Sequence, residues 1–244
     1  MINDTNQLNY EKNAISEKNK FLAKTYAWMS VALLISALSA WLAANSIPIM
    51  NFIWGLSNGG KSVGFLVLVI LELVLVWTLS AKIRKLKLGT VVTVFILYSV
   101  INGLTLSSIF LRFSLSSITY CFIATALMFA VMSIYGMKTK SSLNKAGKYL
   151  MMALIGLIAV SLLNLLISFI TRTPLVWLDW LLSFATVIIF TGLTAYDSQR
   201  ILRASEHSDG NEDYKKLSIY GALELYLDFI NIFLSLLRLF GRRN

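Results

Sequence analysis

The sequence predicts an all-α, polytopic membrane protein with seven transmembrane helices. Hydrophobic residues make up 57% of the 244-residue chain, charged residues make up only 14%, and the mean hydropathy is +0.71. That composition lies outside the range of soluble globular proteins. The sequence also lacks the alternating polar and apolar segments that are typical of a membrane β-barrel. We therefore expect the chain to cross the bilayer as helices.

Seven apolar stretches are each long enough to cross a hydrocarbon core of about 30 Å, which takes about 20 helical residues. They are Leu22–Ala44, Val63–Leu79, Leu88–Leu111, Leu115–Met137, Tyr149–Ile170, Leu175–Tyr196 and Leu217–Phe240. We expect a polar tail over residues 1–20 and one seven-helix transmembrane domain over residues 21–244. The connection 45–62 contains Pro48 and Asn58-Gly59-Gly60, which are turn signals, and is expected to be an external loop.

Basic residues predict how the helices are oriented. Lysines and arginines gather before the first stretch and after the second, fourth and sixth, whereas the other loops hold few. By the positive-inside rule the amino-terminal tail is cytoplasmic, and seven crossings place the carboxy terminus outside. Arg238, Arg242 and Arg243 favour a cytoplasmic carboxy terminus instead, so a re-entrant seventh helix is the alternative. We favour a full crossing, because Leu217–Phe240 is long enough to span.

The formal net charge of +10 at pH 7 follows from these loops. We interpret it as a sign of topology, with some attraction to anionic lipid head groups. No nucleic-acid partner is expected. Cys121 is the only cysteine, so an intramolecular disulfide is excluded.

Two aspartates lie where the chain should be inside the membrane. Asp228 is near the middle of the last stretch, and Asp197 ends the sixth. An ionisable side chain in a spanning helix costs roughly 2.5–3.5 kcal/mol on insertion scales, so it normally has a partner. A helical hairpin with its tip in the polar loop 206–213 would place both aspartates roughly 15–20 Å from that tip. We therefore expect them to pair, although Asp197 alone could instead form an ion pair with Arg200 or Arg203.

The last stretch carries polar residues at spacings of three and four. They are Gly221, Glu224, Asp228, Asn231, Ser235, Arg238 and Arg242. Residues so spaced share one helix face, and a continuous polar face in lipid must turn toward protein or water. The seventh helix is therefore expected to be central in the bundle and to line any polar path. Hydrogen bonding between helices is the alternative purpose of this face.

Other polar residues suggest simpler roles. Glu72 is a third acid expected deep in the membrane. Asp179, near the outer start of the sixth stretch, suits the helix dipole and needs no function. Asn102 and Asn164 could be ligands along a path, but residues of this kind more often join helices by hydrogen bonds, which we expect here. The acidic run after His207 lacks the glycine and the glutamate that an EF-hand loop requires. His207 is the only histidine, so a histidine-based metal site is excluded. No cofactor is expected.

The predicted aspartate pair has a specific chemistry. Two carboxylates within a few ångströms of each other in a low-dielectric site cannot both ionise cheaply, so the pair shares a proton. When deprotonated, it offers the hard oxygen ligands that Ca²⁺ prefers, and its repulsion could drive helices apart. We therefore expect Asp197 and Asp228 to form a proton-sensitive switch that can bind Ca²⁺ transiently. Glu72, Glu224 and Asn231 would line the path or attract cations.

Two segments resemble the signature segments of the Bax-inhibitor family (transmembrane Bax inhibitor motif proteins). They are Phe190-Thr191-Gly192-Leu193-Thr194-Ala195-Tyr196-Asp197-Ser198-Gln199-Arg200-Ile201 and Leu223-Glu224-Leu225-Tyr226-Leu227-Asp228-Phe229-Ile230-Asn231-Ile232-Phe233. The resemblance implies a last helix surrounded by the other six, and a pH-sensitive Ca²⁺ leak controlled by Asp197 and Asp228. The segment around Glu72 is similar to a glutamate-bearing segment of the family. Some members have an arginine that latches onto the acid pair, and Lys82 and Arg84 are the candidates for it here.

The resemblance also implies a second function, that of a regulatory membrane protein in stress protection and in control of membrane-protein quality or cell death. Such a protein would conduct no ions and would act through membrane-protein partners. Paired intramembrane aspartates are also similar to those of aspartyl intramembrane proteases, but Leu225-Tyr226-Leu227 stands where a glycine-rich motif is expected. We therefore expect no enzyme. The compactness of the chain favours a bacterial plasma membrane as its location, and an endomembrane is the alternative.

Overall fold

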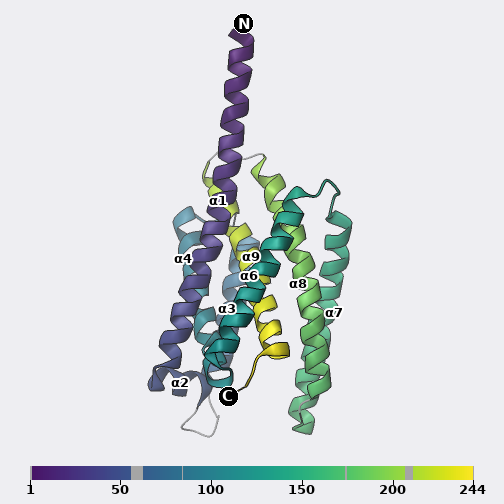
Figure 1. Ribbon diagram of the computed structural model, residues 1–244. Coiled ribbons are helices and arrows are strands. Elements are labelled where there is room, and N and C mark those ends of the chain that lie inside the picture. Colours follow the sequence, from purple (N-terminus) through teal and green to yellow (C-terminus); the bar gives the residue numbers. More distant parts are fainter. Residues whose placement is uncertain (1, 56–62, 84, 174, 207–210, 244) are drawn as a thin grey trace. The chain divides into compact units, whose positions relative to one another are not determined.

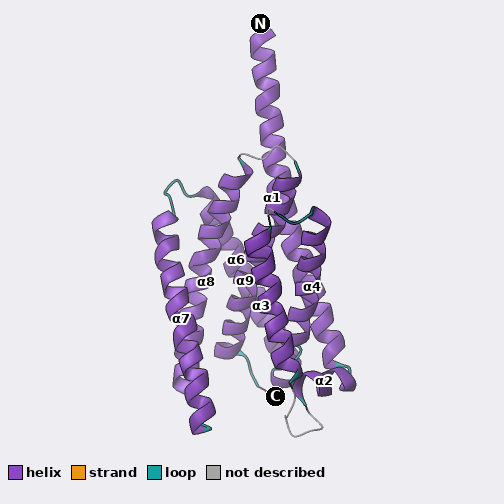
Figure 2. Ribbon diagram, turned by 180° about the vertical axis from the view of Figure 1, so that it is seen from behind, coloured by secondary structure: helices purple, strands orange, loops and turns teal. Residues whose placement is uncertain are grey.

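The computed structural model describes residues 2–55, 63–83, 85–173, 175–206 and 211–243, with side chains from residue 15 onward. Within these ranges the elements are helices (Figures 1 and 2), and the one strand-like pairing is an isolated bridge between Phe113 and Arg243. The all-α prediction is confirmed for this part of the chain.

The helices are joined by short connections. Their bounds are α1 Ile2–Ala44, α2 Ile47–Trp54, α3 Gly64–Lys82, α4 Leu88–Leu106, α5 Ile109–Arg112, α6 Leu115–Lys138, α7 Asn144–Thr171, α8 Val176–Ser205 and α9 Glu212–Phe240. α1 therefore includes residues 2–20 of the predicted tail, and the helix continues without a break into the first apolar stretch.

Six segments of the described chain are long and apolar enough to cross a membrane. They are Ile15–Ala44, Gly64–Lys82, Leu88–Arg112, Leu115–Lys138, Asn144–Thr171 and Val176–Ser205. They correspond to the first six predicted stretches. α9 is 29 residues long, which is about 43 Å at 1.5 Å per residue, but it is not one of the six. Its crossing and its central position in the bundle stay predictions.

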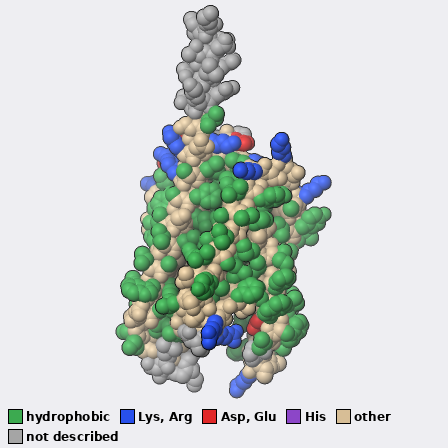
Figure 3. Space-filling model, viewed as in Figure 1, with side chains coloured by type: hydrophobic (Ala, Val, Ile, Leu, Met, Phe, Trp, Pro, Cys, Tyr) green, Lys and Arg blue, Asp and Glu red, His purple; other side chains and the backbone are tan. Residues whose placement is uncertain are grey.

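The outward-facing side chains of these helices are largely apolar. Along α7, which is described throughout, Gly147 and Asn164 are the only buried residues. Figure 3 shows hydrophobic side chains over the visible flanks of the helices, with lysines and arginines gathered toward their ends. Exposed apolar surface of this extent is a liability in water but suits contact with lipid.

The connection 45–62 differs from the predicted loop, because it contains the short helix α2. This helix follows Ser46, has Pro48 in its first turn and ends at Gly55 in the left-handed conformation (φ 63°). Proline is tolerated in a first turn because the N–H there has no helical partner. The predicted turn at Asn58-Gly59-Gly60 lies outside the described residues.

The third predicted stretch is also interrupted, because α4 ends at Leu106 and α5 begins only at Ile109. The buried hydroxyl of Ser107 donates to the carbonyl oxygen of Leu104 at 2.6 Å, and Trp54 Nε1 donates to the same hydroxyl oxygen at 3.3 Å. A serine that bonds to a nearby carbonyl competes with the regular helical hydrogen bonds. The break therefore has a local cause that hydropathy does not register.

Contacts divide the chain into two compact units, each made from two separate parts of the sequence. The first unit is Met1–Arg112 with Ile201–Tyr226, and the second is Phe113–Arg200 with Leu227–Asn244. α8 and α9 thus contribute residues to both units. The predicted boundary at residue 20 does not coincide with a boundary between units.

In the first unit, α4 packs against α1 and α3, and α2 packs against the same two helices. Ile53, Leu68 and Ile101 form a buried cluster where α2, α3 and α4 meet. A Cβ atom on Gly103 would collide with the backbone of Ser36, so glycine permits the close approach of α4 to α1.

In the second unit, α6 touches both α8 and α9. A Cβ atom on Gly136 of α6 would collide with the carbonyl group of Ala195 on α8. Phe122 and Phe129 of α6 pack edge-on against Phe229 of α9, with ring centroids 5.2 and 5.7 Å apart. Small residues therefore set one contact of α6, and aromatic rings set the other.

Gly136→Ala should destabilise the purified protein by about 1–3 kcal/mol, because the new methyl group has no room against α8. Thermal unfolding in detergent measures the effect. Gly156→Ala on α7 is the matched control, since no described atom lies within 4 Å of a Cβ there and alanine is the better helix former. Equal melting temperatures for the two variants would contradict the close α6–α8 contact.

Candidate functional site

The segment of α8 that ends the sixth predicted stretch is buried on almost every side. Between Leu193 and Gln199, Tyr196 is the only residue that is not buried. Asp197 lies in this segment with 9% of its surface exposed. A carboxylate this far from solvent needs polar neighbours, because burying an ionised group alone is costly.

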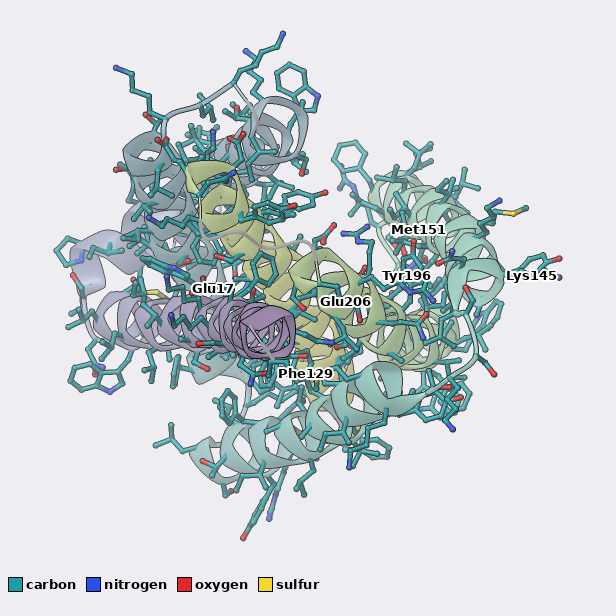
Figure 4. All side chains as sticks on the ribbon, turned by 90° about the horizontal axis from the view of Figure 1, so that it is seen from above. Glu17, Phe129, Lys145, Met151, Tyr196 and Glu206 are labelled. Atoms are coloured by element: carbon teal, nitrogen blue, oxygen red, sulfur yellow. The ribbon has the colours of Figure 1, made fainter. Side chains whose placement is uncertain are left out.

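Small residues on neighbouring helices allow those helices to pack closely against the segment from Leu193 to Gln199. Ser198 Oγ donates to Ser133 Oγ of α6 at 3.0 Å, one turn from the Gly136 contact. On the other side, Gly147 of α7 lies against the ring of Tyr196, which Figure 4 shows beside α7. The backbone around Asp197 is therefore fixed by α6 and α7 together.

Gln199 ties the connection between α6 and α7 to α8. Its Oε1 accepts from the Leu143 N–H at 2.8 Å, and its Nε2 donates to the Ser141 carbonyl oxygen at 2.9 Å. Both ends of the buried amide are thus used. A role for Gln199 was not predicted from the sequence, and the available signal was an amide two residues after an acid at the end of a spanning stretch.

Asp197 also has a cationic neighbour. Arg200 Nη2 lies 3.9 Å from Asp197 Oδ1, and its guanidinium carbon lies 5.9 Å from the centre of the Tyr196 ring. This is the ion pair that was the alternative explanation for Asp197. Because Arg200 is exposed and the separation is long, the pair is worth little to stability.

Asp228 is the most buried acid described in α9, with 3% of its surface exposed. From Ser218 to Leu237 no residue of this helix is exposed. Asn231 Nδ2 donates to the Leu227 carbonyl oxygen at 2.8 Å, so its amide serves its own helix. Asp197 and Asp228 are both buried acids of the second unit, and their pairing stays a prediction.

The other predicted site residues belong to the first unit. Glu72 and Glu224 are half-buried. Lys82 Nζ lies 5.5 Å from the centre of the Trp77 ring on its own helix. Arg84, the other candidate latch, lies outside the described residues, so the latch stays a prediction.

A chain of hydrogen bonds around Tyr226 was not anticipated. The fully buried hydroxyl of Tyr226 donates to Asn102 Oδ1 at 2.7 Å and lies 2.7 Å from Ser36 Oγ. Ser36 Oγ in turn donates to the Ser99 carbonyl oxygen at 2.7 Å. These bonds join α1, α4 and α9. Asn102 was expected to join helices, and a tyrosine between Glu224 and Asp228 was a signal that its hydroxyl needed a partner.

Asn164 and Asp179 are joined across α7 and α8. Asn164 Nδ2 donates to Asp179 Oδ1 at 2.6 Å, so the expectation that Asn164 bonds between helices is confirmed. Among the side chains that the structure describes, no group of three or more His, Cys, Asp and Glu residues could hold a metal ion.

Six long apolar helices with lipid-suited outer surfaces, together with acids buried between helices, are typical of a polytopic helical membrane protein. Residues 18–244 match the sequence model of the family described as "Inhibitor of apoptosis-promoting Bax1". The chain belongs to this family, so the resemblance to the Bax-inhibitor family is confirmed.

Relatives of similar length occur in several bacteria. The chain is 44% identical over 230 residues to the inner membrane protein YbhL of Escherichia coli. The aligned residues cover 91% of this chain and 92% of YbhL. It is 40% identical over 237 residues to an uncharacterized protein of Borreliella burgdorferi, with 97% of each covered. An uncharacterized protein of Deinococcus radiodurans is 31% identical over 234 residues, 96% of this chain and 95% of that protein. The inner-membrane relative agrees with an integral membrane location.

Gln199→Ala should destabilise the protein by about 1–3 kcal/mol, because it leaves the Leu143 N–H and the Ser141 carbonyl without their partner. Thermal unfolding in detergent again provides the measurement. Ser141→Ala is the matched control, since Ser141 contributes its backbone carbonyl to this contact. A Gln199→Ala protein as stable as the control would show that these bonds do not hold the α6–α7 connection.

Proposed function

We propose that this protein is a passive, Ca²⁺-permeable leak channel whose opening depends on pH. The observation that carries the proposal is the burial of Asp197 and Asp228 on α8 and α9 within one compact unit. Ionisable groups kept inside a membrane protein typically mark ion or proton pathways. The leak involves no enzymatic step and no resident cofactor, and Ca²⁺ takes part as the transported ion.

Proton sharing explains how such a pair would gate. Near each other in a low dielectric, the two aspartates hold one proton between them, which limits their repulsion. Loss of that proton at higher pH leaves two like charges, which favours separation of the helices and attracts Ca²⁺. Arg200 is exposed, and its Nη2 lies 3.9 Å from Asp197 Oδ1, so it is only a weak counter-ion for this carboxylate.

The remaining ligands for a passing ion come from α9. Glu224 and Asn231 are half-buried and lie on the same helix face as Asp228 by their spacing. Because the described acids form no cluster of three, Ca²⁺ would be held only transiently by the aspartates and by amide, backbone or water oxygens. Weak, transient binding suits a leak, since an ion must also leave the site.

Ca²⁺ influx into dye-loaded liposomes tests the proposal, measured between about pH 6 and pH 8. Influx through the wild-type protein should rise with pH. Asp197→Asn and Asp228→Asn should lose that dependence, because an amide has no proton to release. Asp179→Asn is the control: it removes an α8 carboxylate outside the pair and keeps an oxygen that can accept from Asn164.

Two results would count against this function. Unchanged pH dependence in both aspartate variants would refute gating by the pair. Absence of influx above that of empty liposomes at every pH, with a folded protein, would favour the regulatory function exercised through membrane-protein partners.

We also propose that α9 crosses the membrane completely and that the carboxy terminus is outside, with the amino terminus in the cytoplasm. The support comes from the second unit. The Ser114 N–H donates to the Arg242 carbonyl oxygen at 3.2 Å, and the Arg242 N–H donates to Ser117 Oγ at 3.0 Å. The end of α9 therefore lies at the start of α6, which is external by the positive-inside rule.

Labelling of single cysteines tests this orientation. Arg243→Cys in a Cys121→Ser background should react with a membrane-impermeant maleimide added outside bacterial spheroplasts. Lys140→Cys, in the exposed α6–α7 connection, should react only after the cells are opened. If both cysteines react only after the cells are opened, α9 is re-entrant. If Lys140→Cys reacts from outside, the whole protein is inverted.

A further inference from the structure

Glu72 belongs to a polar cluster of the first unit in which one hydroxyl group lies within hydrogen-bond distance of two acceptors. Thr105 Oγ1 lies 2.7 Å from Glu72 Oε1 and 2.8 Å from the Asn102 carbonyl oxygen. A hydroxyl has one hydrogen, so it cannot serve both acceptors fully while Glu72 is ionised. A proton on Glu72 Oε1 resolves the conflict, because the acid then donates to Thr105 and Thr105 donates to the Asn102 carbonyl.

The surroundings of Glu72 offer little to balance a negative charge. Glu72 makes no ion pair with any described residue, and neither α2 nor α4, the helices packed against α3, carries a basic side chain. Tyr98 of α4 is a titratable neighbour of Glu72, α2 has none, and α9 contributes Tyr226 with Glu224 two residues before it. An uncharged acid is the form that such a site within a spanning helix accommodates at low cost.

We propose that Glu72 is a second proton-binding site, separate from the aspartates, and that it holds its proton as a neutral carboxylic acid at neutral pH. This inference rests on the proposed function and restricts the role that the sequence predicts for Glu72. Glu72 attracts cations only after it has released this proton. Each compact unit then contains its own proton site, Glu72 in the first unit and the two aspartates in the second.

The proton on Glu72 is linked to α9 by hydrogen bonds. The Asn102 side chain bonds to the Glu72 carboxyl group, and its Oδ1 accepts from the buried Tyr226 hydroxyl. When Glu72 releases its proton to water, Thr105 turns its hydrogen to the carboxylate and the Asn102 carbonyl loses it. The Asn102 amide then bonds to a charged partner, which strengthens the whole chain as far as Tyr226 and Ser36. No other group changes its ionisation. Tyr226 is thus a positioning residue, because its hydrogen bonds to Asn102 and Ser36 hold α9 against α4 and α1.

Infrared difference spectroscopy on the protein in lipid nanodiscs tests the inference without measuring ion flux. The wild-type protein should show a carbonyl stretch of a protonated carboxyl group at neutral pH, lost at high pH, that is absent from Glu72→Gln. Thr105→Val should shift the frequency of this band, because the acid loses its acceptor. Tyr226→Phe should shift both the frequency and the pH at which the band disappears.

Tyr98→Phe is the matched control for Tyr226→Phe. Tyr98 is also buried, its ring lies edge-on to Tyr226 at 5.8 Å, and its hydroxyl makes no hydrogen bond with the described residues. It should leave the band unchanged. Identical spectra for wild type and Glu72→Gln across about pH 5 to pH 9 would overturn the proton site, and equal spectra for the two tyrosine variants would overturn the link to α9. A Glu72 band in a protein without Ca²⁺ flux would instead overturn only the channel function.

Discussion

Water is absent from the hydrocarbon core of a membrane, so a polar group placed there depends on partners inside the protein. Most such groups in this protein satisfy themselves locally, as the Thr194 hydroxyl does by donating to the Phe190 carbonyl oxygen. Carboxylates cannot do so, because they only accept and no helical N–H is free to donate to them. The positions of Glu72, Asp197 and Asp228 therefore determine where neighbouring helices must supply hydroxyl, amide or charged groups.

Small residues make it possible for those groups to reach the acids. Hydrophobic attraction does not drive helices together in lipid, and close packing of backbones takes its place. Gly136 lets α6 approach Ala195, and one turn away Ser133 meets Ser198. In the first unit Gly103 has the same relation to Ser36, whose hydroxyl then reaches Tyr226. In each unit, therefore, a close backbone contact at a glycine lies next to a hydrogen bond between helices.

Hydropathy predicted six of the helices because length and apolar composition alone determine whether a segment can span a bilayer. The short helix α2 and the break at Ser107 were missed, since each depends on one local hydrogen bond or cap that a long window averages out. At the site, the spacing of charges identified the acids. It could not identify Gln199 or Tyr226, whose importance comes from which segments approach them in space.

The interleaving of the two compact units has a consequence for biosynthesis. Each unit includes part of α9, so neither is complete before the last helix has been made. Contacts between segments far apart in sequence form slowly, because a long loop must close first. Until α9 has been synthesised, the earlier helices therefore lie in the bilayer without all of their packing partners, and their glycines and polar side chains are exposed to lipid. During that interval the nascent chain is most dependent on insertion machinery and most open to degradation.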